Sequence, residues 1–119
     1  MMAELEPIQE ELGEIFIADE VVELLIYKLI SETAGLSPPN RVGGEDDLLS
    51  TLSKVYRGKG IKIHKKDDRL WVKLSLIAKY GIKITEAAQA LTQRIEHEVR
   101  RMTGLVVSGV EIEIADIEL

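Results

Sequence analysis

The sequence predicts an α+β domain in which a four-stranded sheet carries two long helices packed on one face. Three observations indicate this class: short segments of alternating apolar and polar residues, two longer segments with apolar residues at helical spacing, and glycines and prolines between them. The expected order is β-α-(α)-β-β-α-β, since each strand and helix has one apolar side to bury. We expect a single domain at residues 13–119, preceded by an acidic flexible leader at residues 1–12.

The first strand is expected at Glu14–Ile17, where Ile15 and Ile17 share one face. Asp19 is predicted to cap the N-terminus of a helix of about fifteen residues, because its carboxylate can accept backbone N–H groups. We expect Gly35 to end this helix. Its apolar stripe consists of Val21, Val22, Leu25, Ile26, Leu29 and Ile30.

A polar loop at Asn40–Gly44 and a shorter helix at Glu45–Arg57 are expected next. The segments Gly60–Lys65 and Leu70–Tyr80 then predict a hairpin around a turn at Lys66–Arg69. In its second strand one set of residues alternates with a more polar set, so one face packs inward. The inward set is Val72, Leu74, Leu76, Ala78 and Tyr80.

Thr85 is predicted to cap a second long helix, which Gly104 ends. Its buried stripe is expected to be Ala88, Leu91, Ile95, Val99 and Met102. A last strand is expected from Val106 to about Ile114, where Val110, Ile112 and Ile114 alternate with glutamates.

The residue inventory argues against catalysis. There is no cysteine, which removes thiolate chemistry and fits a reducing, cytoplasmic compartment. His64 and His97 have no partner at metal-ligand spacing, and Ser75 and Ser108 have no nucleophile elbow around them. The basic segment Arg57–Gly60 lacks the pattern of a phosphate-binding loop. We therefore predict no enzyme, no catalytic residue, no metal and no cofactor, and the apolar runs are too short for a membrane span.

The most suggestive feature is an uneven distribution of charge. Residues Lys54–Lys83 hold ten Lys or Arg and two Asp, a balance of +8, whereas the rest of the chain has a balance of −14. One hypothesis is that the basic hairpin meets acidic surface, from the last strand or leader, of another copy. An alternative is a regulatory or nucleic-acid-binding module using the same hairpin at 54–83, and a third interpretation is ordinary solvated decoration. The candidate interaction residues are Lys59, Lys62, Lys65, Lys66, Arg69 and Lys73.

Five stretches, in order along the chain, carry a likeness to a known family: Gly13–Val22, Lys59–Ile63, Tyr80–Ile84, Met102–Val107 and Val110–Ile114. Together they resemble the alkaline shock protein 23 family of bacterial envelope stress response proteins, over about residues 13–114. The segments 32–37 and 40–58 depart from the family's pattern.

The resemblance implies a non-enzymatic cytoplasmic scaffold or assembly protein linked to cell-envelope homeostasis and the stress response. Such a protein acts by self-association and protein–protein contacts, and is held peripherally at the membrane by a separate, membrane-anchored partner. The resemblance implies a homo-oligomer, and the family has no catalytic residues to transfer. Nucleic acid is an unlikely ligand on other grounds, because the whole chain is acidic and Trp71 is the only aromatic residue of the hairpin sheet that could stack on bases.

Overall fold

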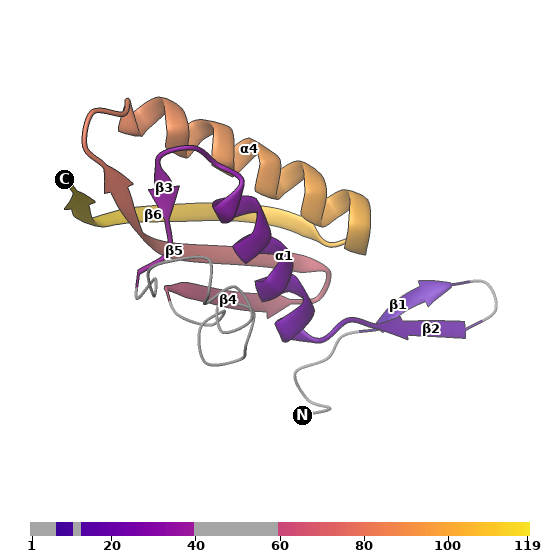
Figure 1. Ribbon diagram of the computed structural model, residues 1–119. Coiled ribbons are helices and arrows are strands. Elements are labelled where there is room, and N and C mark those ends of the chain that lie inside the picture. The colour runs from indigo at the N-terminus through magenta and orange to yellow at the C-terminus, as the bar shows by residue number, and fades with distance from the viewer. Residues whose placement is uncertain (1–6, 11–12, 40–59) are drawn as a thin grey trace.

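The computed structural model describes residues 7–10, 13–39 and 60–119 (Figure 1). The predicted loop at Asn40–Gly44 and short helix at Glu45–Arg57 lie outside these residues, as does Lys59. The described elements are β1 (Pro7–Glu10), β2 (Gly13–Phe16), α1 (Asp19–Ser31), β3 (Leu36–Ser37), β4 (Ile61–Lys66), β5 (Arg69–Lys79), α4 (Ile84–Thr103) and β6 (Val106–Glu118).

Strand β5 is the centre of a four-stranded sheet. Strand β6 pairs with it in parallel along its whole length, so β3 and β4 must both lie along its other edge, where they pair antiparallel with different parts of it. Helix α4 forms the crossover between the parallel strands β5 and β6, as such a connection requires. Helices α1 and α4 cover the same face of this sheet (Figure 1), which confirms the predicted α+β architecture. We call the opposite face the outer face.

The hydrophobic core lies between the sheet and the two helices. Strand β5 supplies its floor with alternate residues, as the sequence pattern predicted for Val72 to Ala78. Tyr80, which was also expected to point inward, lies after the end of the strand and is 72% exposed. The fully or nearly buried residues of β5 are Leu70, Val72, Leu74, Leu76 and Ala78. The helices contribute Val22, Ile26, Tyr27, Leu29 and Ile30 from α1, and Leu91, Ile95 and Val99 from α4. Because these residues come from every layer, the core fixes the position of the helices over β5.

The composition of the sheet differs from the expectation at the N-terminus. The segment Glu14–Ile17 does not join the main sheet: β2 pairs with β1, and the fourth strand of the main sheet is β3. The short β3 takes this place because Gly35, at φ +87°, turns the chain back beside β5 after α1. Leu36 is buried there, whereas Ile15 remains half-exposed. The burial of Leu36 therefore favours β3, rather than the segment Glu14–Ile17, as the fourth strand of the main sheet.

The helix starts also differ from the prediction. Helix α1 is preceded by Ala18 rather than capped by Asp19, and α4 begins one residue before Thr85, after Lys83. Neither N-cap residue makes a side-chain hydrogen bond to the helix. The predicted end of α4 is confirmed, since Gly104 adopts the left-handed conformation at φ 81°.

The buried stripe of α4 ends on a different residue from the one expected. Met102 is 59% exposed, and Thr103 is buried in its place. A threonine is tolerated there because its hydroxyl donates to the Val99 carbonyl and accepts from the Leu105 N–H. The helical spacing of apolar residues alone predicted Met102 as the last buried residue, but the final turn of α4 points Thr103 toward the core instead.

Candidate interaction surface

Four of the predicted interaction residues lie together on the outer face of the sheet. Lys62 and Lys66 come from β4, Arg69 and Lys73 come from β5, and all are exposed. The antiparallel register sets Lys62 beside Lys73 and Lys66 beside Arg69. The hairpin folds locally around the two-residue turn at Asp67–Asp68, where Asp67 has φ 58°. This turn brings cations from separate strands into one surface.

Lys65 does not belong to this surface. Its side chain lies on the helix side of β4 and is only 5% exposed, and Nζ is 3.2 Å from Asp19 Oδ1. The same Nζ atom donates to the Ile17 carbonyl at 3.0 Å. Strand alternation accounts for the difference, because Lys65 shares its face with Ile61 and Ile63. This lysine fastens the entry of α1 to the sheet.

Aromatic rings occupy the middle of the basic surface. The rings of His64 and Trp71, which are register partners, have centroids 5.7 Å apart and are tilted by 45°. Gly109 of β6 lies beside Trp71, and a Cβ atom built there would be 3.3 Å from the indole Cδ1. A shallow hollow of about 430 Å³ runs over these residues, with Lys73 and Glu111 also in its lining.

An acidic row borders the basic surface on the same face. The parallel register places Glu111 beside Lys73, and Glu113, Asp116 and Glu118 follow along β6, all of them exposed. Lys79 adds a further cation beside Glu118. The sequence separated the acidic last strand from the basic hairpin, but it could not show that they are neighbours. Which strand pairs with β5 depends on the crossover through α4.

The sequence also missed an apolar groove on the helix side of the molecule. It has a volume of about 690 Å³ and involves β2, α1 and the C-terminal turn of α4. Phe16, Val21 and Met102 line it, and their exposed fractions are 45%, 53% and 59%. Two of these residues, Val21 and Met102, were expected in buried stripes, and their exposure is the signal that reveals the groove.

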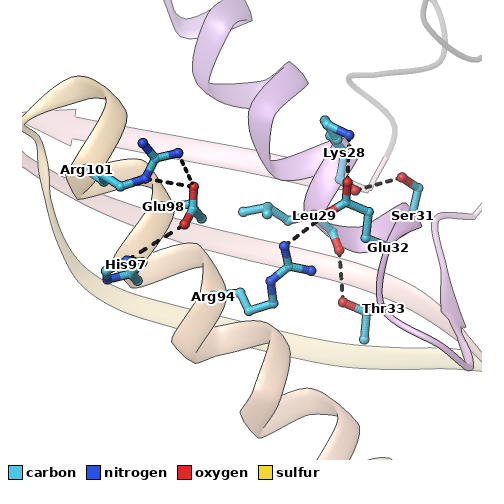
Figure 2. A network of polar contacts seen from close by, with 9 residues as sticks. All are labelled: Lys28, Leu29, Ser31, Glu32, Thr33, Arg94, His97, Glu98 and Arg101. Atoms are coloured by element: carbon cyan, nitrogen blue, oxygen red, sulfur yellow. Dashed lines mark hydrogen bonds and ion pairs between the residues drawn. The ribbon is translucent and has the colours of Figure 1, made fainter.

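A polar network joins the two helices (Figure 2). Glu32, directly after α1, accepts hydrogen bonds from Lys28 at 2.6 Å and from Arg94 of α4 at 2.9 Å. The Lys28 ammonium and the Arg94 guanidinium lower the pKa of Glu32 below its ordinary value. Arg101 similarly lowers the pKa of Glu98, whose carboxylate holds the pKa of Arg101 above its usual range. The Arg94–Glu32 pair joins α4 to the residue that follows α1, whereas the Arg101–Glu98 pair lies within α4.

The described residues contain no group of three His, Asp or Glu side chains placed to hold a metal ion. His64 and His97 are both exposed. Ser108 accepts a hydrogen bond from Arg69 at 3.3 Å and is exposed. No helix within the described ranges is long and apolar enough to cross a membrane. What the outer face offers is a charged, partly aromatic surface for binding.

The chain is similar in sequence to several bacterial proteins. Over 107 residues the chain is 27% identical to the uncharacterized protein YqhY of Bacillus subtilis (strain 168), covering 90% of this chain and 78% of that protein. It is 23% identical over 110 residues to the uncharacterized protein YloU of the same strain, covering 90% of each.

A third relative carries a functional name. The chain is 29% identical over 111 residues to a stress response regulator gls24 homolog of Streptococcus pyogenes serotype M3 (strain MGAS315), and the match covers 89% of this chain and 59% of that protein. No solved structure matches the chain. A family model described as having a cell envelope-related function matches residues 7–119. The chain therefore belongs to the alkaline shock protein 23 family.

Proposed function

We propose that this protein is a non-enzymatic scaffold of the cell envelope stress response that acts by self-association and by contacts with other proteins. The observation that carries the proposal is the division of charge on the outer face. Lys62, Lys66 and Lys73 lie on one side of it, and Glu111 and Glu113 lie on the other. A surface that bears both signs in separate rows is complementary to a second copy of itself.

The family's envelope-related function supports a cellular setting at the cell envelope. We place the protein in the cytoplasm, peripheral to the membrane, where a membrane-anchored partner protein holds it. The apolar groove beside Val21 and Met102 supports a partner of this kind, because exposed apolar grooves are preferred sites for protein contacts. On this proposal the outer face and the groove serve different contacts.

Light scattering of the purified protein across a salt series tests the self-association. We expect oligomers at about 50 mM salt that dissociate toward about 500 mM, because exposed charges are screened over a shorter distance at higher ionic strength. Lys73→Gln should weaken the oligomer, whereas Lys28→Gln removes the same charge from the helix side and serves as the matched control. A monomer at every salt concentration would disprove self-association.

A nucleic-acid-binding module is the second candidate, and one observation favours it. His64 and Trp71 form a ring pair among the cations of β4 and β5, and such rings can stack on bases. The acidic row of β6 on the same face opposes it, since it repels phosphates. A filter-binding assay with single-stranded RNA and DNA at about 50 mM salt separates the two functions, because phosphate contacts give a steep salt dependence.

A further inference from the structure

The four-stranded sheet has two long edges to which no described residue is paired. Strand β4 pairs with β5 on one side, and the described part of the chain provides no strand for its other side. The same holds for the outer edge of β6, which is thirteen residues long. Unpaired N–H and C=O groups on an edge strand are a template for pairing with another chain.

The side chains of the two edges are complementary. At the start of β4, Ile61 and Ile63 lie on the helix side, and Lys62 lies between them on the outer face. On β6 the helix-side residues are Val110 and Ile112, and Glu111 lies between them on the outer face. Each edge therefore alternates apolar residues with charges, and the two edges carry opposite charge.

The backbone polar groups of Ile61 and Ile63 in β4 point away from β5, toward the free edge of the strand. The Ser75 N–H donates to the Gly60 carbonyl at 2.8 Å, so the backbone polar groups of Gly60 point toward β5. In an antiparallel ladder this direction alternates along the strand, so Lys62 also bonds toward β5. The N–H and C=O groups of Ile61 and Ile63 consequently point to the free edge.

The backbone of β6 follows from the same alternation. Since Ser75 bonds toward β4, its neighbour Leu74 bonds toward β6. Leu74 is the register partner of Ile112, and in a parallel ladder a residue bonds to the two neighbours of its partner. Glu111 and Glu113 are those neighbours, so the polar groups of Ile112 point to the free edge.

Strand direction and register complete the match. Strand β4 is antiparallel to β5 and β6 is parallel to it, so β4 is antiparallel to β6. A second copy moved sideways, without rotation, brings its β4 antiparallel to β6 of the first copy. Ile61, Leu74 and Ile112 form one row across the sheet, and Lys62, Lys73 and Glu111 form the next. The unshifted register therefore sets Ile61 opposite Ile112 as a hydrogen-bonded pair and Lys62 opposite Glu111.

The flank of β6 has room for this neighbour. A groove of about 680 Å³ runs between α4 and the helix-side residues of β6, lined by Ala88, Thr92, Val110, Ile112 and Ile114. These three β6 side chains are only partly buried. In Figure 1, α1 lies on the side of the sheet that carries β4. An incoming β4 would arrive with its own α1 beside α4, which would cover the apolar flank.

We propose that β4 of one copy pairs antiparallel with β6 of the next, so that the sheet continues from one molecule to its neighbour. This inference rests on the proposed self-association and names its interface. Pairing of β6 with β6 would place acids opposite acids, and pairing of β4 with β4 would place lysines opposite lysines, both of which are unfavourable. Each copy has one edge of each kind, so the contact can repeat along a row of molecules.

Amide hydrogen exchange of the unmodified protein is the first test. In the oligomer formed at low salt, the N–H of Ile112 should become protected, because it donates across the new edge. In the monomer at high salt it should exchange freely, while the N–H of Leu74 stays protected in both states. Stacking of two outer faces would leave the Ile112 amide free, so oligomers without its protection overturn the edge pairing and leave self-association standing.

Engineered cysteines provide the second test, since the chain has none of its own. A mixture of Lys62→Cys and Glu111→Cys protein should form disulfide-linked heterodimers under oxidation, because directly opposed residues have Cβ atoms about 4.5–5.5 Å apart. Lys62→Cys mixed with Glu86→Cys, on the exposed first turn of α4, is the matched control. Several-fold more heterodimer than in this control supports the interface, and equal amounts overturn it.

Charge exchange covers the case in which a single variant is poorly folded. Lys62→Glu and Glu111→Lys should each weaken the oligomer several-fold, and the double variant should restore it with the net charge unchanged. Failure of the double variant to recover, with its thermal unfolding unaltered, contradicts the pairing. A wild-type protein that is monomeric throughout would instead remove the proposed function itself.

Discussion

Lys65 Nζ lies 3.2 Å from Asp19 Oδ1, and this contact joins the start of α1 to β4 across the buried side of the sheet. The lysine side chain is 5% exposed and the aspartate side chain is 30% exposed, so the pair is poorly hydrated. The same ammonium group also donates to the Ile17 carbonyl, which satisfies a backbone acceptor ahead of the helix. One residue of the basic hairpin therefore serves stability rather than binding.

Replacing Lys65 should destabilise the fold. In Lys65→Met the Asp19 carboxylate loses its ion-pair partner and the Ile17 carbonyl loses a charged donor, in a region with little water, at a cost of about 2–3 kcal/mol. Lys66→Met, on the exposed outer face, should change stability by less than about 0.5 kcal/mol. Urea denaturation at high salt, where association is suppressed, measures both. Equal effects of the two substitutions would contradict the structural role of Lys65.

The link between the helices should depend on pH. Because Lys28 and Arg94 lower the pKa of Glu32 in the folded protein, its contribution to stability is present above the unfolded pKa and is lost as pH falls through the folded value. Glu32→Gln should flatten the loss of stability between about pH 5 and about pH 3. Thermal unfolding across this range measures it, and Glu86→Gln, an exposed carboxyl in the first turn of α4, is the comparison. An unchanged slope for Glu32→Gln would count against the link.

Gly60 should tolerate substitution less well than Gly81. Both have positive φ, at 74° and 99°, so alanine is strained at either position. At Gly60 an added Cβ would also lie 2.7 Å from the Ser75 carbonyl oxygen, whereas at Gly81 it meets nothing within 4 Å. We expect Gly60→Ala to cost about 2–4 kcal/mol and Gly81→Ala about 1 kcal/mol, as measured by urea denaturation. A smaller effect at Gly60 would show that β4 and β5 can separate there.

Leu74 and Met102 should differ sharply as core residues. Leu74 has no exposed surface, so Leu74→Ala should cost about 2–5 kcal/mol through lost contacts and a cavity. Met102 is 59% exposed, so Met102→Ala should change stability by less than about 0.5 kcal/mol. Circular dichroism melts of the two variants make the comparison. A large loss of stability in Met102→Ala would instead show that Met102 belongs to the buried stripe of α4, as helical spacing alone predicted.

The local pattern of the chain was sufficient for most elements. The alternation from Val72 to Ala78 predicted both the strand and its buried face, and Gly104 predicted the end of α4. The pattern did not predict the correct strand pairing where a short segment could pair with more than one neighbour. Leu36–Ser37 is too short to show a period, yet it pairs with β5, whereas the strand-like Gly13–Phe16 pairs with β1 instead.

The candidate surface divides in the same manner. Exposure of Lys62, Lys66, Arg69 and Lys73 followed from their positions in alternating strands, but charge alone could not separate Lys65 from them. Successive side chains of a strand point to opposite faces of the sheet, so a shift of one position moves a lysine from the exposed face to the buried one. The position of Asp19 opposite Lys65 then depends on how α1 packs, which no local window contains.

By itself, the sequence determined the class of fold, the alternating faces of its strands, the division of charge along the chain, and the absence of cysteine chemistry. These are properties of neighbouring residues or of composition, so periodicity and counting reveal them. Only the tertiary structure decided that acidic β6 lies parallel to β5, beside the basic hairpin and on the same face. That arrangement depends on strand pairing between residues about forty positions apart, which the burial of α4 over the sheet selects.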